Sequence, residues 1–205
     1  MKMSFDVRAH FDAVYEKETA LAPVVSYLSQ ELAIILKPGA RILDLGCGDG
    51  RDAVYLAFRG FDVTAVDISE KGIEKTRERA RKYGVKVNAV IGDTRDVGLI
   101  DSFGVCDAVF GYNLLQFLTP EEIRSLLPFL KAKTEPGGAN AFGYLAIADY
   151  YTEKPVPHGF TERDFRNSYK DWDEVYFSEG VVQDVELPEN LKKIWHTAII
   201  VVKPR

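Results

Sequence analysis

The chain has 205 residues, of which 46% are hydrophobic and 28% are charged, values close to those of an ordinary soluble domain with a sizeable core. We therefore expect one domain spanning residues 1–205. The formal net charge is −5 with both signs intermixed, so the sequence shows no basic stripe of the kind that nucleic acid or an anionic membrane surface requires.

The two cysteines, Cys47 and Cys106, lie in glycine-rich or apolar surroundings. We expect both to be reduced, and we expect no metal cluster. The first residues are polar and charged where a secretory signal needs an unbroken apolar stretch, and no run reaches about 18 apolar residues. The sequence therefore predicts a cytoplasmic protein without a membrane partner.

Two helices are predicted at the N-terminus, over residues 6–18 and 20–36, with Pro23 tolerated in the first turn of the second. Residues 1–36 can form a lid across a ligand or a flank packed on the rest of the domain. The sequence leaves both open.

From residue 37 to residue 146, short β-branched runs alternate with helical segments. Because strands joined by helices run parallel with right-handed crossovers, this rhythm predicts an α/β fold with a Rossmann-like, doubly wound sheet. A helix over 119–133 leads through the turn Glu135-Pro136-Gly137-Gly138 into a fifth strand at 139–146. The other expected strands are 40–45, 61–66, 85–91 and 106–111, with helices such as 51–59 and 70–83 between them.

The last part of the chain, residues 147–205, has a different character and is expected to lie on the substrate side of the core. Two extended runs, 174–187 and 193–203, are separated by the short polar loop Pro188-Glu189-Asn190. This spacing predicts an antiparallel hairpin at the C-terminus, which completes a mostly parallel sheet of seven strands.

Three glycines follow the first strand in the stretch LDLGCGDGRD: Gly46, Gly48 and Gly50. Ligands of open α/β sheets bind outside the carboxyl ends of the strands, where this stretch is expected to lie. A plain strand-to-helix turn needs one glycine, whereas three permit positive φ and close approach of the backbone to a ligand. The pattern therefore indicates a ligand-binding loop.

The competing interpretation is a nicotinamide or flavin dinucleotide site, whose fingerprint is G-x-G-x-x-G. Here the third glycine comes one residue early, and the carboxylates of Asp44 and Asp49 would repel a pyrophosphate. Carboxylates suit an ammonium group, and Arg51 with the loop amides suits a carboxylate. A ligand with both groups is an amino acid, and an amino acid joined to a nucleoside is S-adenosylmethionine (SAM).

The ends of the next two strands support an adenosine lying across the sheet. Asp67 follows the second strand, 21 residues after Gly46, where its carboxylate can accept both ribose hydroxyls. Asp93 follows the third strand and can accept from the adenine amino group, while Thr94 begins a helix. Each aspartate could instead cap the helix that follows it. We also expect Ile68 to line the cofactor site.

The fourth strand ends in Gly111-Tyr112-Asn113, next to the position where the methyl group should project. We expect Tyr112 to contact the cofactor and Asn113 to border the reaction centre. The aromatic residues Phe11, Tyr15 and Phe117 can form an apolar lid, or they can serve in ordinary packing.

The stretches LDLGCGDGRD, AVDIS, GD and EPGG resemble those of the class I SAM-dependent methyltransferases over roughly residues 36–146. More narrowly, GCGDGRDAVYLAFRGFDVTAVDIS and HGFTERDFRNSYKDWDEVYFSE resemble the tellurite-resistance methyltransferase family. The resemblance implies that side chains of the closing segments face the substrate, which points to Asp149, His158 and His196. A purely structural role for each histidine is the alternative.

The last hairpin departs from this family pattern. The family carries arginine-containing basic groups there, whereas this chain reads Gln183-Asp184-Val185-Glu186, and His196 is the one possible cation nearby. The departure argues against an oxyanion substrate.

The resemblance implies in-line transfer of a methyl group from SAM to a small molecule, with a chalcogen oxyanion, a thiol and other small nucleophiles as candidate acceptors. A soft nucleophile needs no base, whereas a hydroxyl or an amine would need one such as His196 or Asp149. Two alternatives are a methyltransferase for a protein or larger metabolite, which would use aromatic surface near Tyr150 and Tyr151, and a SAM-binding protein without activity. Either a monomer or a homodimer is compatible with the sequence.

Overall fold

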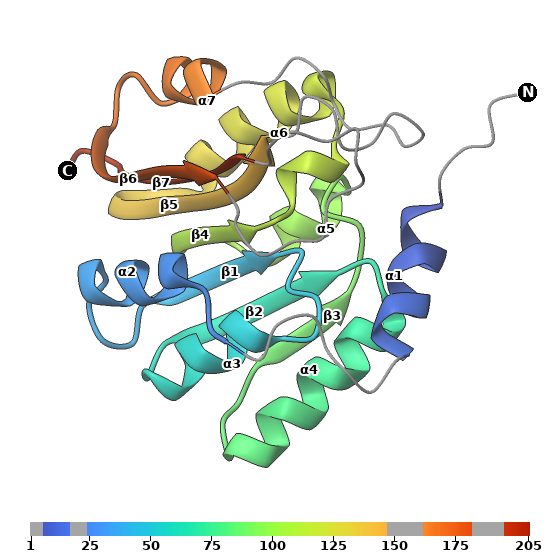
Figure 1. The fold of residues 1–205 in the computed structure, drawn as a ribbon. Coiled ribbons are helices and arrows are strands. Elements are labelled where there is room, and N and C mark those ends of the chain that lie inside the picture. Colours follow the sequence, from blue (N-terminus) through green and yellow to red (C-terminus); the bar gives the residue numbers. More distant parts are fainter. Residues whose placement is uncertain (1–5, 17–23, 147–161, 182–194) are drawn as a thin grey trace, which may run out of the picture.

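The structure, a computed structural model, describes residues 6–16, 24–146, 162–181 and 195–205. These residues form a layered α/β unit in which helices cover both faces of a twisted sheet (Figure 1). The helices are α1 (Val7–Glu16), α2 (Tyr27–Ile35), α3 (Arg51–Phe58), α4 (Glu70–Tyr83), α5 (Val97–Ser102), the 3-10 turn η1 (Leu115–Phe117), α6 (Pro120–Lys133) and α7 (Glu162–Ser168). The strands are β1 (Arg41–Leu45), β2 (Asp62–Asp67), β3 (Asn88–Ile91), β4 (Cys106–Tyr112), β5 (Thr134–Ala146), β6 (Asp173–Val181) and β7 (Trp195–Val202).

The seven strands lie in the order β3-β2-β1-β4-β5-β7-β6. The first five run parallel, and β7 pairs antiparallel with both β5 and β6. This order confirms the predicted doubly wound, mostly parallel sheet with a C-terminal antiparallel hairpin. Strand order reverses between β1 and β4, and such a switch point is where open α/β sheets bind ligands.

Alternate residues along β1 belong to two hydrophobic cores. Leu43 and Leu45 pack with Leu127 of α6, whereas Ile42 packs on the opposite face with Leu32 of α2 and Leu56 of α3. Because successive side chains of a strand point to opposite faces, this strand is apolar on both sides and needs helices on both. The two cores therefore lie on opposite faces of the central strand, below the ends that carry the glycine loop.

The second N-terminal helix begins later than the predicted boundary at residue 20. Within the described residues it starts at Tyr27, after the N-cap Ser26, whose Oγ accepts from the Ser29 N–H. The Ser26 N–H donates to Asp52 Oδ1 over 2.8 Å, so a contact with α3 fixes this boundary. Pro23 lies outside the described residues.

The predicted turn Glu135-Pro136-Gly137-Gly138 is wrong, because these residues belong to β5. The register between β4 and β5 shifts next to Cys106, which gives the strand an irregular start. Gly137 N–H donates to the Lys203 carbonyl (2.9 Å), and Lys203 N–H donates to the Gly138 carbonyl (2.8 Å). Long-range pairing therefore extends the strand through a turn-like sequence.

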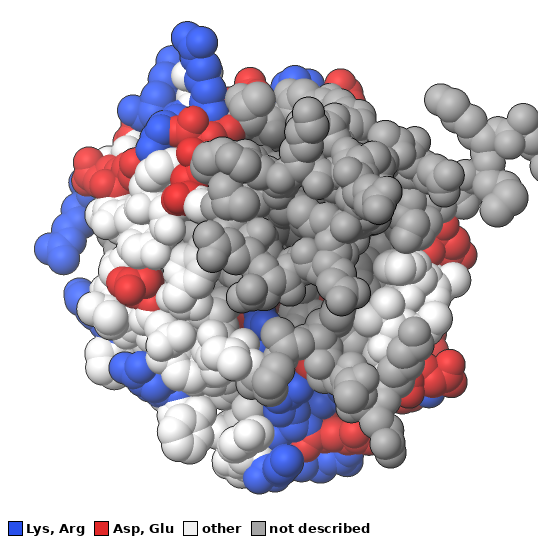
Figure 2. Space-filling model, in the orientation of Figure 1, with Lys and Arg blue, Asp and Glu red and all other residues white. Residues whose placement is uncertain are grey.

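Basic and acidic side chains are interspersed over the described part of the face shown in Figure 2, without a field of one sign. Within the described residues, no helix combines the length and apolar character that crossing a membrane requires. Both cysteines are free thiols.

Candidate functional site

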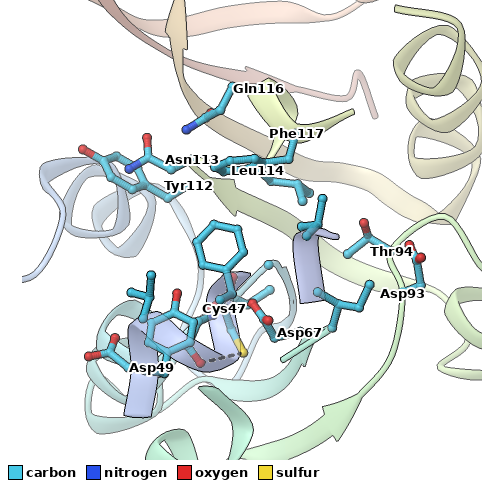
Figure 3. Close-up of a pocket in the computed structure, with 18 of the residues that line it drawn as sticks. Cys47, Asp49, Asp67, Asp93, Thr94, Tyr112, Asn113, Leu114, Gln116 and Phe117 are labelled. Carbon is cyan, nitrogen blue, oxygen red and sulfur yellow. Dashed lines mark hydrogen bonds between the residues drawn. The ribbon is translucent and has the colours of Figure 1, made fainter. Parts of the chain in front are cut away.

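A cavity of about 430 Å³ opens at the carboxyl ends of β1, β2, β3 and β4. Its volume lies within the usual range of small-molecule sites, about 300–1,000 Å³. Figure 3 shows Asp93 and Thr94 on one side, Tyr112 and Asn113 on the other, and Asp67 between them. The cavity brings together these predicted cofactor residues: Asp44, Gly46, Gly48, Arg51, Asp67, Ile68, Asp93, Thr94 and Tyr112.

The glycine loop, residues 46–50, adopts the backbone conformation expected of it. Gly46, Gly48 and Gly50 have φ values of 72°, 57° and 76°, a left-handed region that side chains disfavour. Gly50 is the N-cap of α3, so it lies at the rim of the loop and not among the cavity-lining residues. The loop therefore needs its glycines for conformation as much as for space.

Asp67 joins the glycine loop to the start of α4. Its two carboxylate oxygens accept from the Gly48 N–H and the Ser69 N–H, each over 2.8 Å. Ser69, and not Asp67, is the N-cap of α4. Burial raises the pKa of the Asp67 carboxyl. Because each oxygen has used one lone pair, each retains one for a hydroxyl of a ligand.

Asp44 is almost completely buried, with 1% of its surface exposed, and its Oδ2 has no hydrogen-bond partner. Burial, together with the nearby carboxylates of Asp52 and Asp67, raises the pKa of this carboxyl well above its usual value. A buried carboxylate without a partner is costly, and a cation placed in the cavity would offset that cost.

Arg51 enters the cavity from the first turn of α3. One terminal nitrogen binds Asp52 Oδ2 at 2.9 Å, and the guanidinium lies 5.5 Å from the centre of the Tyr112 ring. Its Nε is buried and has no partner. The side chain is thus held from two sides while one donor remains available.

At the end of the third strand, the structure corrects the expected helix start. Asp93 binds Arg95 through both oxygens, and this interaction lowers the pKa of the Asp93 carboxyl. Thr94 does not begin a helix, since α5 starts at Val97 with Asp96 as its N-cap. The Asp96 side chain accepts from the Leu99 N–H and outcompetes Thr94 for that role.

Asn113 directly follows β4 and has a left-handed conformation, φ 61°, the one such non-glycine residue in the described part of the chain. Its N–H donates to the Gly143 carbonyl over 2.6 Å, and its Oδ1 is buried without a partner. Strained backbone and an unused acceptor at a cavity wall are features of functional sites.

His196 does not line the cavity and lies one ring behind its wall. Its ring packs against Tyr112 at 5.2 Å between centres, and its Nδ1 is 2.7 Å from the Tyr27 hydroxyl. Its Nε2 is buried without a partner, and burial lowers the pKa of the imidazole to about 4. Asp149, His158, Tyr150 and Tyr151 lie outside the described residues.

Helix α1 forms part of the cavity wall. Phe11 packs edge-on against Phe117 of η1 at 5.0 Å between ring centres, and Tyr15 also lines the cavity. Asp12 accepts from the Ser69 hydroxyl over 2.6 Å, which ties α1 to the N-cap of α4. Phe11, Tyr15 and Phe117 therefore lie in the cavity wall, and their role as a lid stays a prediction.

The family model described as "Tellurite resistance protein TehB" matches residues 7–197 of this chain. The chain belongs to the TehB family. This membership confirms the resemblance drawn from the glycine loop and from the segment around residues 158–179.

Two TehB comparisons concern Haemophilus influenzae. The chain is 29% identical over 169 residues to a protein named probable S-adenosyl-L-methionine-dependent methyltransferase TehB, covering 80% of this chain and 56% of that protein. The crystal structure of TehB from that organism superposes with a TM-score of 0.75 at 24% identity, covering 96% of this chain and 66% of that chain. The chain thus spans about half the length of its curated TehB relatives.

Outside the TehB family, the structure of magnesium protoporphyrin IX methyltransferase from Synechocystis with bound S-adenosylhomocysteine (SAH) superposes with a TM-score of 0.72 at 16% identity. That match covers 96% of this chain and 98% of the other, and it shows a shared fold.

The sequence did not indicate several of the cavity residues, among them the polar residues Asp52, Arg95 and Gln116. Asp52 and Arg95 directly follow residues that were singled out, Arg51 and Thr94. Gln116 lies in the segment that follows the fourth strand, where the strand-end rule could have been extended by a few residues. No group of described residues is arranged to hold a metal ion.

Proposed function

We propose that this TehB-family chain is a SAM-dependent methyltransferase that binds its cofactor in the cavity at the switch point of the sheet. One observation carries the proposal: three cavity residues of complementary chemistry hold buried polar atoms without partners, namely Asp44 Oδ2, Arg51 Nε and Asn113 Oδ1. Native proteins rarely leave such atoms unsatisfied, and a bound ligand is one explanation.

The first two of these atoms suit the amino-acid part of SAM. Asp44 offers a buried anion for the ammonium group, and Arg51 offers a buried donor for the carboxylate. Asp67 retains a lone pair on each oxygen for the two ribose hydroxyls. The solved relatives with SAH, including the N-methyltransferase NodS of Bradyrhizobium japonicum, support the same cofactor on this fold.

A dinucleotide fits the cavity less well. The cavity wall carries five carboxylates, of which those of Asp49, Asp52 and Asp93 are paired with Arg79, Arg51 and Arg95. No ion pair among the described residues includes the other two, Asp44 and Asp67. A pyrophosphate would therefore meet an excess of negative charge.

SAM, when bound, supplies a methyl group on a positively charged sulfur that is displaced in line by a nucleophile. The main task of the protein is then to position the two reactants, which can lower the free-energy barrier by about 7–11 kcal/mol. Phe11, Phe117 and Tyr112 line the cavity, and their rings would help to exclude water from a bound ligand. Asn113 also lines the cavity, and its unpaired Oδ1 can accept a hydrogen bond from an acceptor hydroxyl, amine or thiol.

We propose further that the methyl acceptor is a small molecule without negative charge. The support is the excess of carboxylates on the described wall, which disfavours selenite or tellurite. His196 lies behind Tyr112 and its pKa is lowered to about 4, so at neutral pH it is an uncharged base and not a cation for an oxyanion. Asp149 keeps its proposed role as an alternative base.

The experiment measures SAH release with two groups of methyl acceptors. Selenite and tellurite are negatively charged oxyanions, whereas neutral thiols, phenols and amines carry no negative charge. Turnover with uncharged acceptors is expected. Turnover with the oxyanions alone would contradict the proposed acceptor charge. If SAH binds but no small acceptor reacts, a protein acceptor or a role without catalysis would replace the small-molecule proposal.

A further inference from the structure

Side chains on one face of α4 donate hydrogen bonds to the glycine loop. Thr76 Oγ1 donates to the Gly48 carbonyl over 3.0 Å. Arg79 donates from Nε to the Asp49 carbonyl (3.1 Å) and from Nη2 to Asp49 Oδ2 (2.6 Å). Because Thr76 and Arg79 are three residues apart in a helix, they present these donors side by side.

The same face of α4 packs tightly against the loop. A Cβ built on Gly72, one turn before Thr76, would lie 2.9 Å from the Gly48 carbonyl oxygen. A Cβ built on Gly50 would lie 2.8 Å from the Thr76 Cα. Thr76 is fully buried, so its hydroxyl has lost water and depends on the loop carbonyl.

The ion pair between Arg79 and Asp49 determines which carboxylate near the loop is free to bind a ligand. Asp49 lines the cavity, but its side chain is paired with Arg79. Asp44 has no such partner on its Oδ2. Arg79 therefore neutralises one acid of the cavity and leaves the other for a positively charged ligand.

We infer that Thr76 and Arg79 are positioning residues of the cofactor site. Neither lines the cavity; both act through Gly48 and Asp49. A loop with three left-handed glycines is costly to order, and these bonds order it before the ligand arrives. Without them, the ligand itself must supply the ordering free energy, and its affinity falls. This inference rests on the proposed use of SAM.

The test compares SAH affinity by calorimetry, and KM for SAM against kcat, in Thr76→Val, Arg79→Gln and the wild type. Each variant should weaken SAH binding about 10-fold, the loss of one or two hydrogen bonds. The value of kcat should change less than two-fold at saturating SAM, because the reacting groups are untouched. Arg79→Lys, which keeps the charge next to Asp49, should recover part of the affinity.

Arg77→Gln is the matched control, because Arg77 Nη2 donates to the Ala89 carbonyl over 2.7 Å on the same helix but away from the loop. It should leave SAH affinity unchanged even if it lowers the melting temperature. Equal losses of affinity in Arg77→Gln and Arg79→Gln would overturn the inference, as would unchanged affinity in Thr76→Val and Arg79→Gln. Absence of SAH binding in the wild type would instead overturn the proposed function.

Discussion

Tyr15 lies directly over Gly48: a Cβ built on that glycine would be 2.3 Å from the Tyr15 hydroxyl oxygen. The tyrosine is buried, and burial next to Asp67 and Asp49 raises the pKa of its hydroxyl. The Tyr15 side chain of α1 therefore fills the space that a side chain at position 48 would need. Glycine at position 48 is required both for backbone conformation and for contact with α1.

Gly48→Ala should lower the free energy of unfolding by more than the left-handed conformation alone costs, about 1–2 kcal/mol. The added methyl group must also displace Tyr15. In a Tyr15→Ala background the cost of Gly48→Ala should fall to the conformational part. Chemical denaturation of the four proteins measures this coupling, and equal costs in both backgrounds would show that Tyr15 does not restrict the loop.

Asp44→Asn should stabilise the ligand-free protein at neutral pH and weaken SAM binding. The pKa of the Asp44 carboxyl is raised on folding, so the folded state binds a proton more tightly and ionisation costs stability as pH rises above about 4. The stability difference between variant and wild type should vanish at lower pH. Denaturation across pH 3–8 measures it; a variant less stable than wild type at pH 7 would contradict the account.

Arg51→Gln should weaken SAH binding about 10-fold or more, because it removes a charged donor for the ligand carboxylate. Binding of methylthioadenosine, which lacks the amino-acid part, should change less than two-fold. Asp67→Ala is the comparison: it should weaken both ligands and also lower stability, since Gly48 and Ser69 lose their acceptor. Equal losses for both ligands in Arg51→Gln would remove Arg51 from the carboxylate subsite.

His196→Gln should change stability more than turnover, because His196 packs behind Tyr112 and does not line the cavity. Its pKa is lowered from 6.5 to about 4, so the wild type should lose stability as pH falls from 6.5 towards 4, where the unfolded chain takes up a proton first. The variant should lack this part of the pH dependence. A large fall in kcat with unchanged stability would instead place His196 in the catalytic machinery.

Binding of the cofactor should protect the N-terminal residues, including α1, from protease. Asp12 binds Ser69 at the start of α4, and Tyr15 packs on Gly48 of the glycine loop, so ligand and helix should stabilise one another. Limited proteolysis with and without SAH measures cleavage within residues 1–20. Equal cleavage rates would mean that α1 is a fixed flank of the sheet and not a lid.

The order of elements and the ligand edge could be predicted because their signals are local. Three glycines spaced by single residues after an apolar strand predict left-handed backbone at the carboxyl end of β1, and all three are left-handed in the structure. The βαβ rhythm likewise predicts a parallel sheet, and the structure has one.

The errors arose where distant residues decide the outcome. The start of α2 depends on the bond from Ser26 to Asp52, and the extension of β5 depends on pairing of Gly137 and Gly138 with Lys203. Such pairings are tertiary and leave little local signal.

The most direct test of the central claim is calorimetric titration of the protein with SAM and SAH, with NAD as the control ligand. We expect SAM and SAH to bind with micromolar affinity and NAD not to bind. Binding of NAD, or no binding of SAM and SAH, would contradict the assignment of Asp44, Arg51 and Asp67 to a methyl-donor site.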